Sequence, residues 1–99
     1  LYEGGTRGAA FIHSPIMSIV QQTSEQMIHI TDWLPTLASA AGAMRWVPNG
    51  LDGKNQWPSL NGRTPPPRDT FIYHLDDHHF MRGGIRMGDY KLLMGNIVM

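Results

Sequence analysis

One short helix sets the framework for this chain. Its apolar residues recur at the spacing of a single helix face: Leu34, Leu37, Ala38 and Ala41. Thr31 or Asp32 can accept hydrogen bonds from the free amides of the first turn, and Gly42 can end the helix in a left-handed conformation. We therefore expect a helix over residues 32–41 that packs its apolar stripe on a sheet, and we expect Asp32 to act as its cap.

Short strands are expected on both sides of this helix. Residues 9–14 form a nearly continuous apolar run, which is typical of a strand buried on both faces. Residues 70–74 are rich in β-branched and aromatic side chains, which predicts another strand. Residues 84–87 and 90–94 flank a Gly-Asp turn, as in an antiparallel hairpin. Helix and strands together indicate an α/β protein.

The segments between these elements predict loops. Gly4 to Gly8 read as a flexible entry, and residues 43–70 are rich in turn pairs and proline. Three consecutive prolines at 65–67 indicate a domain boundary or crossover near residue 64. The chain starts at Leu1 and stops shortly after a predicted strand, so we expect it to be a piece of a longer protein.

The charge balance excludes several classes of function. Eight Lys and Arg oppose 8 Asp and Glu, and only 16% of the 99 residues are charged. A chain of this kind lacks the basic surface that binds nucleic acid or an anionic membrane, so we expect no nucleic-acid partner. The apolar stretches are too short to cross a bilayer, so we expect no membrane insertion. There is no cysteine, which excludes disulfides and thiolate metal ligands.

A dense group of potential metal ligands lies between two predicted strands: His74, Asp76, Asp77, His78 and His79. Imidazole and carboxylate together suit zinc or a non-haem metal. Neighbouring side chains in extended backbone point to opposite sides, so a solvated loop is the competing interpretation. A third alternative is that His74 alone faces a ligand pocket from the end of its strand.

A carboxylate and a guanidinium flank the first glycine pair. Glu3 and Arg7 can form a structural ion pair beside a tight turn, or Arg7 can bind an anionic substrate through its planar fork. The three tryptophans are expected to serve packing rather than to form a sugar platform. No nucleophile elbow or phosphate-binding loop is present, so these residues alone assign no function.

Five sequence words, taken together, resemble the sulfatase family and most closely the arylsulfatase B type. The matching words run in order along the chain: residues 1–8 (LYEGGTRG), 29–37 (HITDWLPTL) with Ala41-Gly42, 51–53 (LDG) with Trp57, Pro67-Arg68, and 85–93 (IRMGDYKLL). The resemblance implies the alkaline-phosphatase-like sulfatase fold, of which this chain is a part. Residues 1–63 are then the end of the large mixed-sheet catalytic domain, and residues 64–99 the start of the small antiparallel-sheet C-terminal domain.

The resemblance also implies a chemistry. Such enzymes hydrolyse sulfate esters, with a formylglycine as nucleophile and calcium on the sulfate, and relatives act on aryl sulfates or on sulfated glycosaminoglycan sugars. It implies a lysosomal or secretory location as well. Glu3 and Arg7 match the motif that shapes the active-site wall, and His74 lies where relatives carry a His-Asn pair, so these three are substrate-pocket candidates.

Most of the implied machinery is outside this chain. There is no cysteine, and the run from Thr64 to Arg68 has the spacing of the formylglycine motif but begins with Thr. The calcium ligands and the catalytic lysine belong to earlier family segments, so no catalytic or metal residue is assigned here. We expect the chain alone to be inactive. The alternative hypothesis is a non-catalytic structural or binding module derived from a sulfatase.

Overall fold

The computed structural model describes residues 2–19, 21–76 and 82–95. These residues form two compact units. The helical unit comprises residues 13–68, and the sheet unit combines residues 1–12 with residues 69–99. The predicted division of the parent protein into residues 1–63 and 64–99 concerns its complete domains and stays a prediction.

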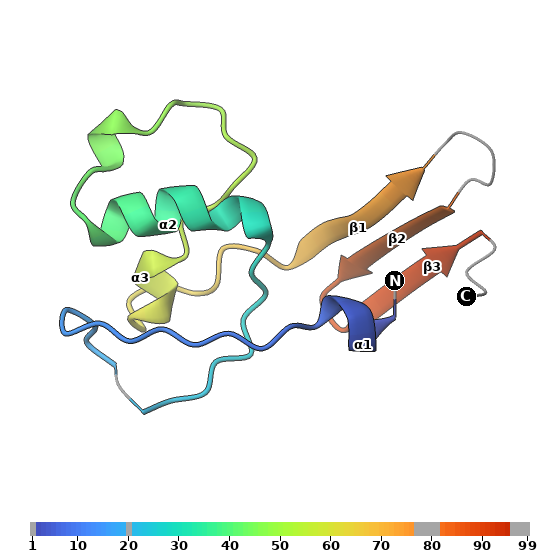
Figure 1. Cartoon of the computed structure of the whole chain (residues 1–99), viewed down its shortest axis with the longest axis horizontal. Helices are drawn as coiled ribbons and strands as arrows, with labels where there is room; N and C mark the ends of the chain where they lie inside the picture. The colour runs from blue at the N-terminus through green and yellow to red at the C-terminus, as the bar shows by residue number, and fades with distance from the viewer. Residues whose placement is uncertain (1, 20, 77–81, 96–99) are drawn as a thin grey trace. The chain divides into compact units, whose positions relative to one another are not determined.

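The helical unit is organised by helix α2, Trp33–Ala40 (Figure 1). A short 3₁₀ turn, η1 (Ile30–Asp32), leads directly into it. Gly42 follows the helix with a φ of +70°, a left-handed conformation that glycine adopts without steric cost. The predicted helix and its glycine terminator are therefore confirmed.

Two further helical segments lie in the region expected to be loop: η2 (Met44–Trp46) and α3 (Trp57–Leu60). Pro58 stands within the first turn of α3, where the missing amide of proline costs no helical hydrogen bond. Asn61 and Gly62 close this helix, and Gly62 has a φ of +71°. A one-turn helix of this kind carries too little periodicity to be seen in the sequence.

No large hydrophobic side chain of the described residues is fully buried. The buried side chains of the helical unit are instead mostly polar: Asp32, Thr36, Gln56 and Asn61. The expected apolar stripe of α2 is largely in water, since Leu34 is 59% and Leu37 is 62% exposed. The unit is therefore specified from within by hydrogen bonds, and it leaves an apolar helix face uncovered.

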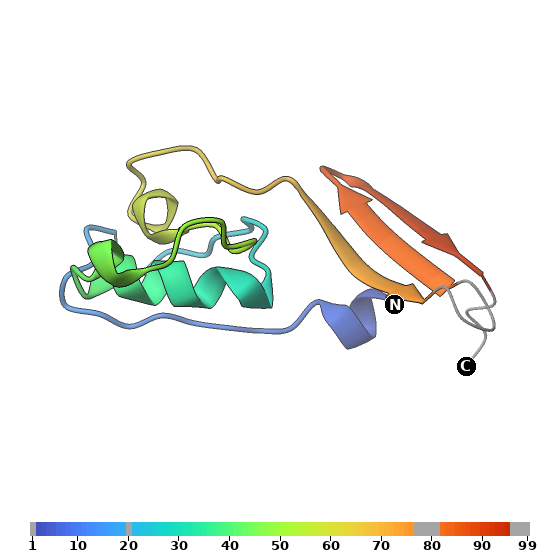
Figure 2. The same ribbon diagram turned by 90° about the horizontal axis from the view of Figure 1, so that it is seen from above.

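The sheet unit contains three antiparallel strands in the order β1 (Thr70–Asp76), β2 (Arg82–Met87) and β3 (Tyr90–Met94). Figures 1 and 2 both draw β2 between its two partners. Gly88 forms the tight turn with a φ of +58°, so the predicted hairpin is confirmed. A register shift between Ile72 and His74 marks an irregularity in the β1–β2 pairing.

The cross-strand register separates the two faces of this sheet. Ile72, Ile85 and Leu92 stand opposite one another in one row, and Ile72 and Leu92 are 53% and 63% exposed. The neighbouring row joins Phe71, Arg86 and Lys91, and none of these three is fully exposed. Because successive residues of a strand point to opposite faces, the first row belongs to an open apolar face and the second to a partly covered one.

Two expectations for the beginning of the chain are wrong. The predicted flexible entry contains a single helical turn, α1 (Glu3–Thr6). The predicted strand at residues 9–14 is irregular, and Phe11 is 91% exposed. A strand needs a hydrogen-bonding neighbour, and no ladder in the described chain includes these residues. In the described residues, no helix is long and apolar enough to cross a bilayer.

Candidate functional site

Glu3 is tied to the sheet by two side chains that are far from it in sequence. The Lys91 ammonium donates to Oε1 of Glu3 at 3.0 Å, and the Tyr73 hydroxyl donates to the same oxygen at 3.4 Å. The hydrogen bond from Lys91 is the main reason why the pKa of Glu3 lies below its usual range. Glu3 is therefore an ionised anchor for the first helical turn.

Lys91 is held in place by aromatic contacts. Its ammonium lies 4.2 Å from the centroid of the Tyr73 ring, a cation–π geometry. The Tyr73 ring in turn packs edge-on against Phe71, with centroids 4.4 Å apart. The Lys91 side chain is only 18% exposed, whereas that of Glu3 is 45% exposed. The sheet side of this contact is thus more ordered than that of a typical surface ion pair.

Arg7 lies directly at the end of the anchored turn. Its backbone amide donates to the Glu3 carbonyl at 2.8 Å, which closes α1. Arg7 is exposed, and its guanidinium makes no hydrogen bond or ion pair with any described residue. The predicted alternative of an ion pair between Glu3 and Arg7 is wrong, because Lys91 takes that place. Arg7 keeps its donors available to an anion from outside the chain.

His74 is not joined to these residues. It lies in β1 opposite Gly84, beside the register irregularity, and it is exposed. Within residues 2–19, 21–76 and 82–95, no hydrogen bond or ion pair connects His74 to Glu3 or Arg7. The structure therefore brings two of the three predicted pocket residues together and leaves the third apart.

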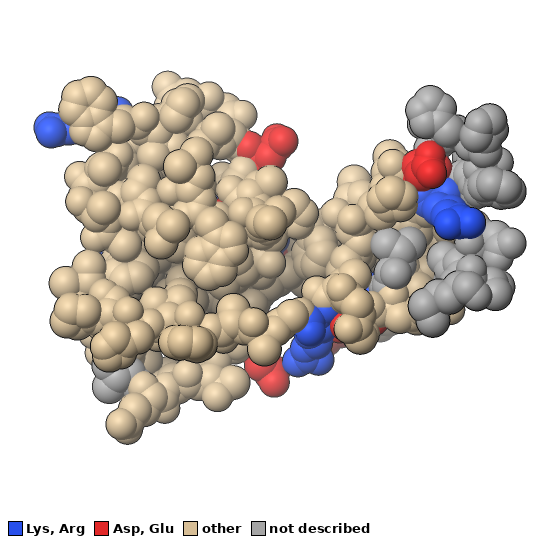
Figure 3. All heavy atoms as spheres, viewed as in Figure 1, with Lys and Arg blue, Asp and Glu red and all other residues tan. Residues whose placement is uncertain are grey.

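The predicted metal cluster falls largely outside the description. Asp77, His78 and His79 are not among the described residues, so the zinc or non-haem metal hypothesis for residues 74–79 stays a prediction. Among the residues that are described, no three His, Asp or Glu side chains come close enough to hold an ion. On the face drawn in Figure 3, Lys, Arg, Asp and Glu gather in small separate groups rather than in one charged patch.

Asp32 is the centre of the most completely bonded group in the helical unit. Its side chain is fully buried, and the Arg68 guanidinium binds both carboxylate oxygens, with Nε 2.9 Å from Oδ2 and Nη2 2.6 Å from Oδ1. The backbone amides of His29 and Lys54 add bonds of 2.9 and 2.8 Å, and Gln56 Nε2 adds one of 2.9 Å. The Asp32 network, as we call these five residues, connects three stretches of the chain: residues 29–32, residues 54–56 and Arg68.

The electrostatics of Asp32 follow from these donors. Burial by itself would raise its pKa, because a charge is poorly solvated away from water. The hydrogen bonds from Arg68, from the two backbone amides and from Gln56 outweigh burial and lower the pKa to about 2. A carboxylate that is saturated with donors and closed to solvent has no free lone pair for a substrate. We therefore interpret Asp32 as structural.

Asp32 does not cap α2 itself, but it completes a capping box with His29 at η1, the 3₁₀ turn that leads into that helix. Its side chain makes no hydrogen bond to the first amides of that helix. It accepts instead from the His29 amide, which lies before η1, and its remaining bonds go to other segments. The sequence offered no local signal for this, because Arg68 is 36 residues away from Asp32. Only the Pro67-Arg68 word of the resemblance pointed to that arginine.

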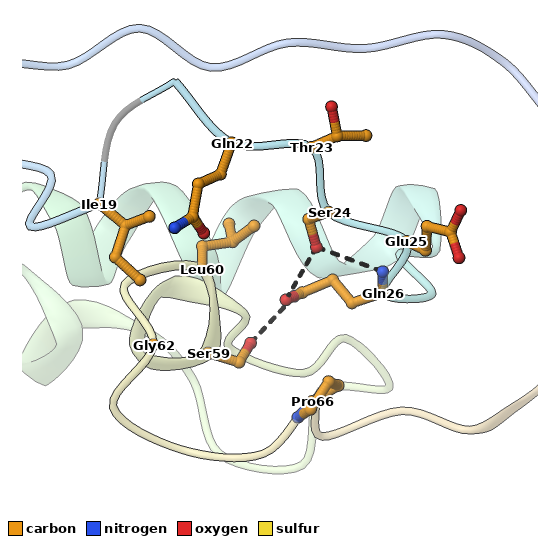
Figure 4. A pocket seen from close by; sticks show the side chains of 10 residues that line it. All are labelled: Ile19, Gln22, Thr23, Ser24, Glu25, Gln26, Ser59, Leu60, Gly62 and Pro66. Atoms are coloured by element: carbon orange, nitrogen blue, oxygen red, sulfur yellow. Dashed lines mark hydrogen bonds between the residues drawn. The ribbon is translucent and has the colours of Figure 1, made fainter.

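A shallow cavity lies within the helical unit between Ile19, residues 22–26 and the C-terminal end of helix α3 (Figure 4). The Gln26 side chain lines this cavity, and its Nε2 donates to Gln56 Oε1 at 2.7 Å and to Ser59 Oγ at 2.9 Å. The labelled Ser24, Gln26 and Ser59 side chains point toward one another and bond among themselves in Figure 4. Three of the polar side chains that line the cavity are therefore already partnered, and Glu25 is the one charged residue of its described lining.

Comparisons with known proteins favour one class. No family model matches the chain, and no solved structure matches it. The chain is similar to arylsulfatase J of Mus musculus, with 29% identity over an alignment of 112 residues. The alignment covers 96% of this chain and 19% of that protein, so the chain spans about a fifth of its relative.

This similarity supports a relationship to the sulfatase family. The observed mixture of short helices with a three-stranded antiparallel sheet fits a C-terminal fragment of such a protein.

Proposed function

We propose that this chain is part of a sulfuric ester hydrolase of the arylsulfatase type, with the alkaline-phosphatase-like sulfatase fold in the complete protein. The observation that carries the proposal is the similarity to arylsulfatase J along 96% of the chain. The substrate is a sulfate ester, either an aryl sulfate or a sulfated glycosaminoglycan sugar, as in arylsulfatase B. The parent is expected in the lysosome or the secretory pathway.

The described residues fit a supporting role in such an enzyme. The chain contains no cysteine, and its described residues contain no acidic cluster suited to calcium. Formylglycine and calcium, the nucleophile and the Lewis acid of the proposed reaction, would thus come from other segments of the parent. The contribution of this chain is to present Arg7, and with it a donor fork for the sulfate oxygens.

The uncovered apolar faces support the same interpretation. Leu34 and Leu37 on α2 and Leu92 on the sheet are each at least 59% exposed. Exposed apolar surface of this kind is typical of faces that another part of a protein covers. We expect the remaining four-fifths of an arylsulfatase-sized parent to supply that cover.

The test compares the full-length protein that contains this chain with the 99-residue chain itself. Both are assayed with 4-nitrocatechol sulfate, and with 4-nitrophenyl phosphate as the control for general esterase activity. We expect the full-length protein to hydrolyse the sulfate ester and the isolated chain to be inactive. A purified and folded full-length protein without sulfatase activity would overturn the proposal and favour the non-catalytic module. Turnover by the isolated chain would contradict the supporting role.

A further inference from the structure

The side chain that fixes the Glu3 carboxylate is Lys91, which lies 88 residues further along the chain. We propose that Lys91 is a positioning residue, which acts with Tyr73 through Glu3 to place Arg7 for the sulfate group of the substrate. The proposal rests on the proposed function for the identity of the anion. The tie between Lys91 and the first helical turn is a separate statement about the fold and can be tested without any activity.

The first step of the argument is the order of Lys91 itself. It lies in β3 opposite Arg86, so its backbone is fixed by the ladder. Its ammonium lies over the Tyr73 ring at 4.2 Å, and the same tyrosine donates to the same Glu3 oxygen. Two groups from the outer strands β1 and β3 thus converge on one carboxylate oxygen. A flexible glutamate is thereby restricted to one placement.

The second step is the transmission from Glu3 to Arg7. The Glu3 carbonyl accepts from the Arg7 amide at 2.8 Å, and Gly5 donates to the Tyr2 carbonyl at 3.0 Å. The Thr6 hydroxyl also donates to Tyr2, at 3.1 Å. These bonds make residues 2–7 a single closed turn, so a shift of Glu3 moves the backbone of Arg7 with it.

The third step concerns the positive charge of Arg7, which has no acidic partner among the described residues. Lys91 is neutralised by Glu3 at 3.0 Å, whereas Arg7 has no described acidic partner. Arg86, another cation of this face, donates to the Gly88 carbonyl at 2.9 Å. Arg7 therefore keeps an unengaged fork, and a guanidinium fork matches the oxygens of a sulfate group. Its position, rather than its charge alone, decides how well it binds.

The experiment uses the full-length protein with Lys91→Met, Lys91→Arg, Arg7→Ala and the double variant Lys91→Met/Arg7→Ala. Lys54→Met, which removes a lysine side chain from the helical unit and keeps the backbone amide that binds Asp32, is the matched control. The readouts are KM and kcat for 4-nitrocatechol sulfate, together with hydrogen exchange of the Gly5 and Arg7 amides. Exchange reports the closed turn directly, since both amides donate within it.

We expect Lys91→Met to raise KM about two- to fivefold, the factor that a partly exposed ion pair contributes, with a smaller change in kcat. Exchange of the two amides accelerates, Lys91→Arg restores both readouts, and Lys54→Met changes neither. The double variant has the KM of Arg7→Ala alone, because both changes act through one group.

An unchanged KM in an active Lys91→Met enzyme, or additive effects in the double variant, overturns the positioning role. A wild-type protein without turnover overturns the proposed function instead, and unchanged exchange in Lys91→Met then also refutes the tie.

Discussion

The helical unit and the sheet unit are each stabilised internally by a different kind of interaction. In the helical unit, the fully buried Asp32 collects five hydrogen bonds, and the Arg68 side chain that binds it is only 11% exposed. In the sheet unit, the backbone ladder provides the order, and the tie from Lys91 to Glu3 lies partly in water. One charged pair is therefore a structural centre, and the other is an adjustable contact at the surface.

The difference follows from solvent access. A buried carboxylate without its partner keeps a large desolvation cost, so every donor in the Asp32 network is needed. An exposed carboxylate without its partner is simply solvated by water, so the sheet can lose the Glu3 contact and remain folded. A side chain that must shift slightly during function is therefore better held by an exposed contact, such as that between Glu3 and Lys91, than by a buried one.

Removal of the Arg68 guanidinium is expected to cause the largest difference in stability between the two units. Arg68→Met leaves the buried Asp32 carboxylate with backbone and amide donors but without a counter-charge, and we expect the helical unit to lose about 3 kcal/mol of stability. All three tryptophans lie in this unit, so tryptophan fluorescence during urea unfolding of the chain follows it. Arg63→Met, at an exposed arginine, is the control and should change stability little.

A result in which the two variants unfold at the same urea concentration would contradict the central role of Asp32. Amide exchange of β2 gives the complementary measurement, because that strand belongs to the sheet unit. It should be the same in Arg68→Met and in the unchanged chain. Equal losses in both units would show that they unfold together and that the comparison drawn above does not hold.

Gly53→Ala, which adds a methyl group next to the Asp32 network, tests whether the close packing there contributes to stability. A Cβ at this position would overlap the carbonyl oxygen of Thr31, next to Asp32, so the loop that carries the Lys54 amide must move. We expect Gly53→Ala to cost about 2 kcal/mol, within the range for overpacked sites. Gly8→Ala, in the sheet unit, meets no atom within 4 Å and serves as the control. Equal fluorescence-detected unfolding of the two variants would refute the tight approach.

The elements with local signals could be predicted from the sequence. Helix α2 carries its apolar period and its Gly42 terminator within a dozen residues, and the β2–β3 hairpin carries its turn at Gly88. Both were predicted because the information is contiguous. The strand expected at residues 9–14 failed for the opposite reason, since a strand is defined by a partner that local composition cannot supply.

The contacts that define the candidate site could not be predicted in this way. Lys91 and Glu3 are 88 residues apart, and Arg68 and Asp32 are 36 residues apart. Nothing in the surroundings of Glu3 distinguishes a partner at residue 91 from the nearby Arg7. The sequence therefore identified Glu3 and Arg7 as a pair of interest, and the fold decided which cation binds the carboxylate.

The pH and salt dependence should distinguish the carboxylates of Asp32 and Glu3, and the effect at Glu3 is the smallest expected here. The pKa of Asp32 falls from 3.8 to about 2 on folding, so its stabilisation is complete above about pH 4 and is lost as the pH falls toward 2. We expect about 2 kcal/mol of pH-dependent stability from this group, and Asp32→Asn should remove that dependence.

The pKa of Glu3 is also lowered, but its contact with Lys91 is exposed. This contact should therefore weaken in 1 M NaCl, whereas the Asp32 network should not. Urea unfolding by tryptophan fluorescence from pH 5 to pH 2, at low and high salt, measures the first group. Exchange of the Arg7 amide under the same salt conditions measures the second. If added salt shifts the acid transition of the helical unit as strongly as it shifts Arg7 exchange, Asp32 is not shielded and the contrast between the two pairs is wrong.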